Sequence, residues 1–446
     1  MHKYYFWCTL TESRSFVMII NLQKKTLVLI ILICSAAVTF AQQDESQVQV
    51  VYPETPNLYA EADNATIKLI SNVDDLVAKK QYATAFNTLG ADNDNPFIIA
   101  KKIDFCIENF VGTNMYQSFT FKDLSQDETL DSARDSHETL PEIAYDPVKI
   151  VTDYETKNGD SGILDKALGD YYMSCYRYFG ENWLIPEKDI FDKASNYYQS
   201  ALTKNYFDVQ SLKDFALCLL HLEKYQDAEN ILNKELQYTQ DSDAHYYLAI
   251  ACIYQNNYDQ GAAEGEKAIA LYDSDPNIKP EVINTYKADA YLLCADAALY
   301  AEKFDKAIDY TNKVLEYVKG DYRAYDEFIS IYLAEKDFTN ASLYADKLFA
   351  IAPESPSATQ MVFKKYYGTA NDELEKFFTR NIQTYNDNPS VLGNLYYHLA
   401  YLYYSEQKKD ESVNAAHLCR DNYTKSQEYE GNTKDAVDSL ISACEQ

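Results

Sequence analysis

The sequence predicts an all-α chain built from repeated helix pairs, and three observations carry that prediction. Glycine and proline interrupt regular elements, and the 446 residues include only 12 glycines and 11 prolines, so long helices with short turns are expected. Apolar residues make up 47% of the chain, which is enough for a core. An aromatic residue followed three positions later by a small residue recurs at intervals near 34 residues. Helix pairs of that period bury their apolar faces only by stacking on one another, so we expect a helical solenoid.

The recurring residues lie in the second half of the chain. They are Tyr225 with Ala228, Tyr258 with Gly261, Phe304 with Ala307, and Phe338 with Ala341. The intervals between the aromatic residues are 33, 46 and 34 residues, and the longest contains an insertion of 12 residues at 272–283. We expect each small residue to let the two helices of a pair approach closely, while the aromatic residue fills the gap at the turn. Pro353 then ends the unit that contains Phe338.

These residues resemble the tetratricopeptide repeat (TPR) family across about residues 163–446. Residues 357–388 are similar to a degenerate helix pair in which Phe377 and Phe378 provide a core face. The resemblance implies an all-α TPR helix-turn-helix solenoid of about six to seven helix pairs over residues 161–446, which holds other molecules and catalyses no reaction. An earlier unit, with an insertion between its helices around 180–186, also matches the family pattern at Leu168, Gly169, Tyr172, Ala194, Tyr198 and Ala201.

A different organisation is expected before the solenoid. Residues 42–65 are polar, with two prolines, and are interpreted as a linker. Residues 66–160 carry helical periodicity, and we interpret them as an irregular helical cap that shields the first repeat. Within this cap, residues 115–124 alternate enough for a short extended segment. Residues 125–138 are acidic and poor in apolar side chains, which is typical of a loop.

The first 41 residues resemble a secretory signal peptide. Lys24-Lys25 forms a positive region, 26–38 is an apolar run, and Thr-Phe-Ala at 39–41 places small residues ahead of cleavage near Ala41. An uncleaved membrane anchor stays the alternative, whereas cleavage leaves no integral membrane span. Met18 is an alternative start, so residues 1–17 would not be translated. The ending Phe-Ala-Gln-Gln resembles Bacteroidetes signal peptides and implies an exported protein of the periplasm or cell envelope.

The charge of the chain argues against two classes of partner. The net charge is −29, and the first 41 residues contribute +3 from four basic and one acidic side chain, so their removal leaves −32. A chain this acidic repels phosphate backbones and anionic lipids. We therefore expect no nucleic acid and no anionic membrane surface as partner, and a protein or peptide partner that is basic or neutral.

No motif for catalysis, metal binding or a cofactor is present in the sequence. The five histidines beyond residue 41 form no HExxH spacing, and the chain has no glycine-rich phosphate loop and no GxSxG. His245 and His398 are flanked by aromatic residues, which favours packing. No CxxC occurs among the seven cysteines beyond residue 41, so we expect buried thiols, although export would permit disulfides. The sequence therefore predicts no enzyme, no metal and no cofactor.

Ligand-binding residues are expected on the first helix of each pair, because first helices line the groove of a stacked array. An aromatic and acidic groove would fit a basic or extended peptide, while the alternative is that many of the tyrosines pack between helices. TPRs that clamp a carboxylate tail use Lys and Asn, whereas this chain offers Lys213 with Leu217, and acid at later units. The groove candidates are Tyr246, Tyr254, Asp296, Tyr300, Asp326, Tyr397, Tyr401 and Tyr404.

These observations favour a non-catalytic TPR scaffold for protein–protein interaction in the periplasm or cell envelope. A glycan-binding component is the alternative, since the helical core resembles that of SusD-type starch-utilisation proteins. Those proteins are usually lipid-anchored and carry long insertions, which this chain lacks. Self-assembly through an exposed terminal repeat is a third possibility.

Overall fold

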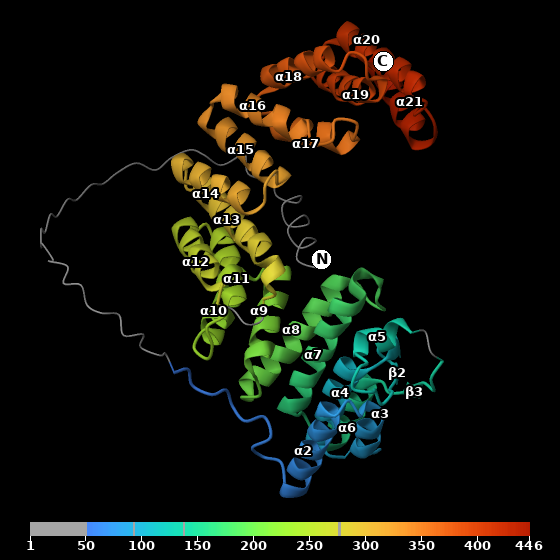
Figure 1. The fold of residues 1–446 in the computed structure, drawn as a ribbon, viewed down its shortest axis with the longest axis vertical. Coiled ribbons are helices and arrows are strands. Elements are labelled where there is room, and N and C mark those ends of the chain that lie inside the picture. Colours follow the sequence, from blue (N-terminus) through green and yellow to red (C-terminus); the bar gives the residue numbers. More distant parts are fainter. Residues whose placement is uncertain (1–50, 92–93, 137–138, 275–277) are drawn as a thin grey trace, which may run out of the picture. The chain divides into compact units, whose positions relative to one another are not determined.

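The computed structural model describes residues 51–446 except 92–93, 137–138 and 275–277. The predicted signal peptide and its cleavage point lie outside the described residues. The chain divides into two compact units, unit 1 ending at Cys218 and unit 2 beginning at Leu219. Each unit is an array of helices (Figure 1), which confirms the predicted all-α fold.

Unit 1 begins with short helices and a small sheet and continues as longer helix pairs. The strands form an antiparallel sheet in the order β1-β2-β3, with Phe119 paired to both Thr113 and Ile143. Its elements are α2 (Asn64–Ala78), α3 (Tyr82–Leu89), α4 (Pro96–Asn109), β1 (Gly112–Asn114), β2 (Ser118–Thr120), α5 (Leu130–Asp135), β3 (Ile143–Ala144), α6 (Pro147–Asn158), α7 (Gly162–Phe179), a 3-10 turn η1 (Gly180–Asn182), α8 (Glu187–Thr203) and α9 (Val209–His221), which crosses the unit boundary.

The helices of unit 1 begin where the sequence supplies caps. The Asn95 side chain accepts hydrogen bonds from the backbone N–H groups of Phe97 and Ile98, and Pro96 takes the first helical position, where no N–H is needed. Asp146 caps α6 in the same way, ahead of Pro147. These caps position α4 and α6 against α7, the first helix of the next pair.

The segment 115–124 contains β2, so its alternating residues form a short extended segment, as expected. Phe119 is fully buried, and Phe121 stacks on the Phe86 ring at 4.5 Å between centroids. The segment 125–138 differs from the expected loop, because it contains α5. The Thr129 side chain and Ser132 cap one another across the start of this helix, which stabilises a turn that has little apolar surface.

Unit 2 is a succession of helix pairs, and in Figure 1 its colours pass from green to red helix after helix. From α7 to α20 the helices alternate as seven successive pairs, which agrees with the predicted number. Its elements are α10 (Tyr225–Glu235), α11 (Ser242–Tyr254), α12 (Tyr258–Leu271), a 3-10 turn η2 (Pro280–Val282), α13 (Ile283–Tyr300), α14 (Phe304–Tyr317), α15 (Tyr322–Glu335), α16 (Phe338–Phe349), α17 (Pro356–Tyr366), α18 (Asn371–Thr384), α19 (Pro389–Ser405), α20 (Lys409–Ser426) and α21 (Gly431–Glu445).

The recurring aromatic residues are the first residues of the second helices. Helices α10, α12, α14 and α16 begin at Tyr225, Tyr258, Phe304 and Phe338. Two positions earlier in each case, a residue other than glycine adopts a left-handed backbone conformation, with φ between 58° and 64°. That conformation reverses the chain between the two helices, and it costs about 1 kcal/mol for an L-residue. The same turn therefore recurs with the sequence period.

The recurring small residues lie at the closest approach of the paired helices. Ala228, Ala307 and Ala341 are fully buried. A Cβ atom on Gly261 would lie 2.7 Å from Cγ1 of Ile253 on the preceding helix, so the backbone of α12 could not approach α11 as closely. Pro353 lies in the turn between α16 and α17. The small residues thus set the spacing within each pair.

Seven cysteines of the described chain are buried and free: Cys106, Cys175, Cys218, Cys252, Cys294, Cys419 and Cys444. Burial raises the pKa of each thiol, so all are neutral at physiological pH and act as small apolar side chains.

None of the described helices has both the length and the apolar character that crossing a bilayer requires.

Ala341 offers a test of the small-residue rule. We expect Ala341→Leu to lower the free energy of unfolding by about 1–3 kcal/mol, because the added atoms have no room between α15 and α16. Ala334→Leu, at an exposed position of α15, should change stability by less than about 0.5 kcal/mol. Urea denaturation followed by circular dichroism measures both, and equal effects would contradict the proposed close packing.

Candidate functional site

The first helices of unit 2 form a continuous surface. Helices α11, α13, α15, α17 and α19 contact one another in succession, so that the repeats present an extended surface. We call their exposed side the first-helix face. Rigid helices carry its side chains, so the geometry of a site here does not depend on loops.

Two carboxyl groups meet at the middle of this face. Asp296 on α13 and Glu327 on α15 share a hydrogen bond in which the protonated Asp296 is the donor. Only 7% of Glu327 is exposed, and its Oε1 atom has no hydrogen-bond partner among the described residues. Burial, then the carboxylate of Asp326, raises the pKa of Glu327 to about 7. Burial and the charge of Glu327 raise the pKa of Asp296 well above its ordinary value.

One lysine faces this pair from the next first helix. The Nζ atom of Lys365 on α17 lies 2.8 Å from Oδ2 of Asp326, and it donates a hydrogen bond of 2.7 Å to Oγ of Ser330. Burial alone would lower the pKa of Lys365, but the charges of Asp326 and Glu327 outweigh it, so the ammonium group stays charged. Asp296, Asp326, Glu327 and Lys365 together form what we call the acidic centre.

A second ion-pair group lies beside the acidic centre. Arg323 on α15 contacts Asp289 of α13 at 2.6 Å and Asp321 at 2.6 Å. This guanidinium group therefore ties two first helices together and is already engaged by two carboxylates. Tyr246 on α11 lies near Asp289, and burial followed by that charge raises the pKa of its hydroxyl. The ring of Tyr246 packs against the buried cluster around Tyr272, so Tyr246 is partly a core residue.

The tyrosines at the ends of α11 and α13 cover the aromatic residues of the preceding turns. Tyr254 stacks on Tyr225 with 4.8 Å between ring centroids and 7° between ring planes. Tyr300 lies 5.6 Å from Tyr258, but 53% of it stays exposed. Tyr254 thus contributes mainly to packing, while Tyr300 presents a free ring surface beside the acidic centre.

The three candidate tyrosines of α19 separate into two groups. Tyr401 lies 5.8 Å from Phe363 and 5.9 Å from Tyr367, and it is 44% exposed. Tyr404 is 47% exposed. Tyr397 instead packs toward α20 and α21, with the buried clusters that include Ala416 and Cys419. An exposed aromatic patch therefore includes Tyr401 and Tyr404 but uses Tyr397 as support.

Sequence reasoning placed Asp296, Tyr300 and Asp326 on this face but missed Glu327 and Lys365. Glu327 follows Asp326 directly and lies one position away from the expected groove line. Its burial arises from α13 and α17, which are distant in sequence, so no local pattern marks it. Lys365 belongs to the degenerate helix pair, where the repeat register is hard to assign from sequence.

His245 and His398, for which the sequence favoured packing, differ in their contacts. His398 contacts the backbone oxygen of Asn394 at 3.1 Å, and its ring lies 5.2 Å from Phe363. Burial lowers the pKa of His398, so it is neutral. The Nδ1 atom of His245 lies 2.7 Å from Oε2 of Glu264, a buried residue of α12.

Unit 1 contains charged clusters on its own helices. Lys166 on α7 contacts Asp170 at 2.7 Å and Asp208 at 2.9 Å. Asp104 on α4 has an unpartnered Oδ1 atom, and its burial raises its pKa to about 7. These groups join α4, α7 and the segment before α9 by charge as well as by packing.

Three carboxylates of unit 1 offer ligand atoms within 4.8 Å of one another. They belong to Glu155, Asp160 and Asp165, which form the group of possible metal ligands found in the described part of the chain. Lys204 forms ion pairs with both Asp160 and Asp165. Because the ammonium group already occupies the space between two of the three carboxylates as their ion-pair partner, this group does not indicate a metal site.

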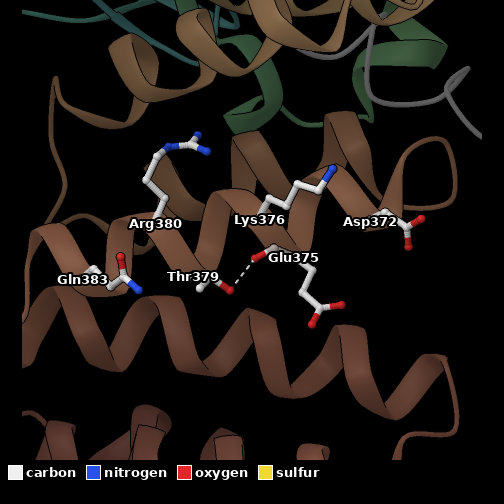
Figure 2. Close-up of a pocket in the computed structure, with 6 residues that line it drawn as sticks. All are labelled: Asp372, Glu375, Lys376, Thr379, Arg380 and Gln383. Atoms are coloured by element: carbon white, nitrogen blue, oxygen red, sulfur yellow. Dashed lines mark hydrogen bonds between the residues drawn. The ribbon is translucent and has the colours of Figure 1, made fainter.

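A surface hollow lies on a second helix, α18. It has a volume of about 520 Å³ and is lined by Asp372, Glu375, Lys376, Thr379, Arg380 and Gln383. Figure 2 shows that these side chains diverge, with Arg380 and Lys376 on one side of α18 and Glu375 on the other. Arg380 binds Asp346 at 2.9 Å, and Glu375 accepts a hydrogen bond from Tyr403. The residues are engaged with neighbouring helices and do not converge on a common point.

No protein-family model matches the chain, and no curated protein matches it. Among solved structures, the C-terminal part of a TPR repeat-containing protein from Cytophaga hutchinsonii is 14% identical over 60% of this chain and 98% of that one, with a TM-score of 0.38. A tetratricopeptide repeat protein from Parabacteroides merdae is 12% identical over 63% and 99%, with a TM-score of 0.37. MamA is 21% identical over 43% and 92%, with a TM-score of 0.35. The TPR-type fold of this chain rests on its own helix pairs and their recurring turns.

The acidic centre predicts a pH dependence of stability. Because the folded-state pKa of Glu327 is raised to about 7, its contribution is fully present below the unfolded value near 4.5 and is lost as the pH rises through 7. We expect the free energy of unfolding to fall between pH 5 and 8, and Glu327→Gln to remove about 1–3 kcal/mol of that fall.

Urea denaturation at a series of pH values measures this effect as the difference between variant and wild type. Glu335→Gln removes an exposed carboxyl from the same helix and should leave the pH profile unchanged. A Glu327→Gln profile parallel to that of the wild type would show that Glu327 does not titrate as the buried pair requires.

Proposed function

We propose that this TPR-type chain is a non-catalytic scaffold that binds a protein or peptide along the first-helix face of unit 2, in the periplasm or cell envelope. The observation that carries the proposal is the succession of contacting first helices, which present an acidic centre and exposed tyrosines on one rigid surface. Such a surface offers charge and aromatic contacts at fixed positions, as an extended peptide requires.

The charges of this face favour a basic or neutral partner. Asp326 is partly exposed and Lys365 is its cationic neighbour, while Asp296 and Glu327 have no second cation of their own. An acidic partner would meet buried carboxyl groups that already repel one another. A basic segment would instead relieve that repulsion, so charge complementarity supports the choice of partner.

Catalysis is a weaker interpretation of the same groups. Carboxyl groups with raised pKa values occur in active sites, but a general acid also needs a cavity that positions a reacting bond. The charged neighbours of Glu327 are two further carboxyl groups and an ion-paired lysine. The arrangement suits recognition of a positive charge better than proton transfer.

A glycan is the second candidate for the ligand. Its support is the exposed patch of Tyr401 and Tyr404, because aromatic ring faces stack on sugar rings. This candidate uses the end of the first-helix face that contains α19, whereas a basic peptide would also use the acidic centre. The two candidates can therefore be separated by the ligand that is captured.

Export to the periplasm or cell envelope is supported by the sequence of residues 24–41, with its positive, apolar and small-residue segments. A secreted scaffold of charge −32 would also stay dispersed in a crowded envelope, since like charges oppose association.

Affinity capture from the native cell envelope tests the scaffold proposal. The mature chain should retain one protein in a fixed ratio, and Tyr401→Ala combined with Tyr404→Ala should weaken that retention at least fivefold, because the exposed rings are removed. The control variant, Leu343→Ala with Ile351→Ala, removes two exposed apolar side chains outside the first helices and should bind normally. Retention on a polysaccharide column without a protein partner would contradict the scaffold and favour the glycan.

The export proposal has its own test. We expect the mature protein to begin at Gln42 and to fractionate with the periplasm or envelope, because cleavage follows the small residue Ala41. Mass spectrometry of the N-terminus measures this directly. Ala41→Phe should slow processing and leave a longer chain. A wild-type protein that keeps residues 24–41 would show that the segment is an anchor.

A further inference from the structure

The acidic centre lacks one positive charge. It brings three carboxyl groups, Asp296, Asp326 and Glu327, together with a single ammonium group on Lys365. Lys365 already contacts Asp326 and Ser330. The nearby Arg323 is engaged by Asp289 and Asp321. The charge of Lys365 also acts on Asp296 and Glu327, but a single ammonium group does not balance three carboxyl groups, and a proton is held within the Asp296–Glu327 pair.

The buried carboxyl group of Glu327 includes an acceptor that no N–H or hydroxyl group satisfies. Its Oε1 atom has no such donor among the described residues, although only 7% of the residue is exposed. A buried acceptor without a donor costs about 1–3 kcal/mol in general. The protein thus holds an unfilled acceptor within a cluster of negative charge, and a donor group from another molecule would satisfy it.

The aromatic ring of Tyr300 lies beside the two carboxyl groups. Tyr300 follows Asp296 by one helical turn on α13, and more than half of it is exposed. Burial, followed by the charges of Asp296 and Glu327, raises the pKa of the Tyr300 hydroxyl, so its ring lies close to both carboxyl groups. Tyr254 and Tyr258 are also near Tyr300 and support its ring from the preceding pair.

We propose that Asp296 and Glu327, beside Tyr300, form a subsite for one arginine side chain of the partner, whose guanidinium group takes the place of the proton that the two carboxyl groups share. This inference rests on the proposed peptide-binding function and specifies its contact. A guanidinium group donates several parallel N–H bonds and stacks on an aromatic ring, so it matches a carboxyl pair beside a tyrosine better than the point charge of a lysine.

The exchange balances in protons and charge. The free pair holds one proton between two carboxyl groups; the bound pair is fully ionised and contacts one guanidinium group, and the proton passes to the buffer. The other groups that face the pair are Asp326 and Lys365, which keep their mutual ion pair, and the Tyr300 hydroxyl. Binding should therefore release a proton near pH 7, and it should weaken as the pH falls.

Calorimetric titration of the mature full chain tests this subsite with two matched probes. The first is the capped peptide acetyl-Ala-Arg-Ala-amide, and the second replaces arginine by citrulline, which keeps the shape but removes the charge. At pH 7.5 and 0.15 M salt, we expect the arginine peptide to bind at least tenfold more tightly than the citrulline peptide. Repeating the titration in two buffers of different ionisation enthalpy should show about one proton released, because the proton that the pair holds leaves when both carboxyl groups are ionised.

Variants separate the subsite from general attraction by an acidic protein. Glu327→Gln should reduce the arginine preference to less than twofold and abolish proton release, while Tyr300→Leu should reduce it about threefold. Asp309→Asn removes the same charge from an exposed position of α14 and should keep the full preference. Circular dichroism melting curves check that each variant is folded.

Equal binding of the two peptides, or an arginine preference that persists in Glu327→Gln, would overturn the subsite. Its failure is distinguishable from failure of the scaffold. If the Glu327→Gln variant still captures the envelope partner and the Tyr401–Tyr404 variant does not, the scaffold stands without this subsite. If the arginine peptide binds as expected but no envelope protein is captured, the subsite stands and the proposed scaffold function fails.

Discussion

The close approach of the two helices within each pair is the constraint on which the rest of the structure depends. Fully buried Ala307 and Ala341, and Gly261 with no room for a Cβ atom, allow each second helix to lie directly against its first helix. When the two helices of each pair lie this close together, the first helices of successive pairs contact one another. A larger residue at these positions would separate the helices, and side chains that now meet across α13, α15 and α17 would move apart. The recognition surface is thus a consequence of small residues buried beneath it.

That packing also explains why charge accumulates on one face. Adjacent first helices place their side chains at fixed separations, so acids on neighbouring helices face one another whether or not they attract. Lys365 compensates Asp326, and Arg323 compensates Asp289 and Asp321. Asp296 and Glu327 are left with a shared proton, which lowers the electrostatic cost but leaves one acceptor unsatisfied. Polar groups that cost stability in the free protein are suited to a partner that supplies the missing donor.

Prediction from sequence succeeded where the signal was local and periodic. The helix starts at Tyr225, Tyr258, Phe304 and Phe338 coincide with the recurring aromatic residues. It was less complete for the groove, because a first-helix position does not determine exposure. Tyr254, at such a position, stacks on an earlier turn. The acidic segment expected as a loop contains α5, since the reciprocal Thr129–Ser132 cap compensates for poor apolar content.

The sequence by itself determined the class of the protein: repeated helix pairs with small residues where the helices meet. These features follow from spacing along the chain, and a period of about 34 residues is visible without any tertiary information. Only the tertiary structure decided which acids share a proton and which tyrosine keeps a free ring. Glu327 is exceptional because α13 and α17 remove it from water, and that burial depends on the lateral register of three helix pairs. Register across stacked helices is set by packing between residues far apart in sequence, so no local pattern encodes it.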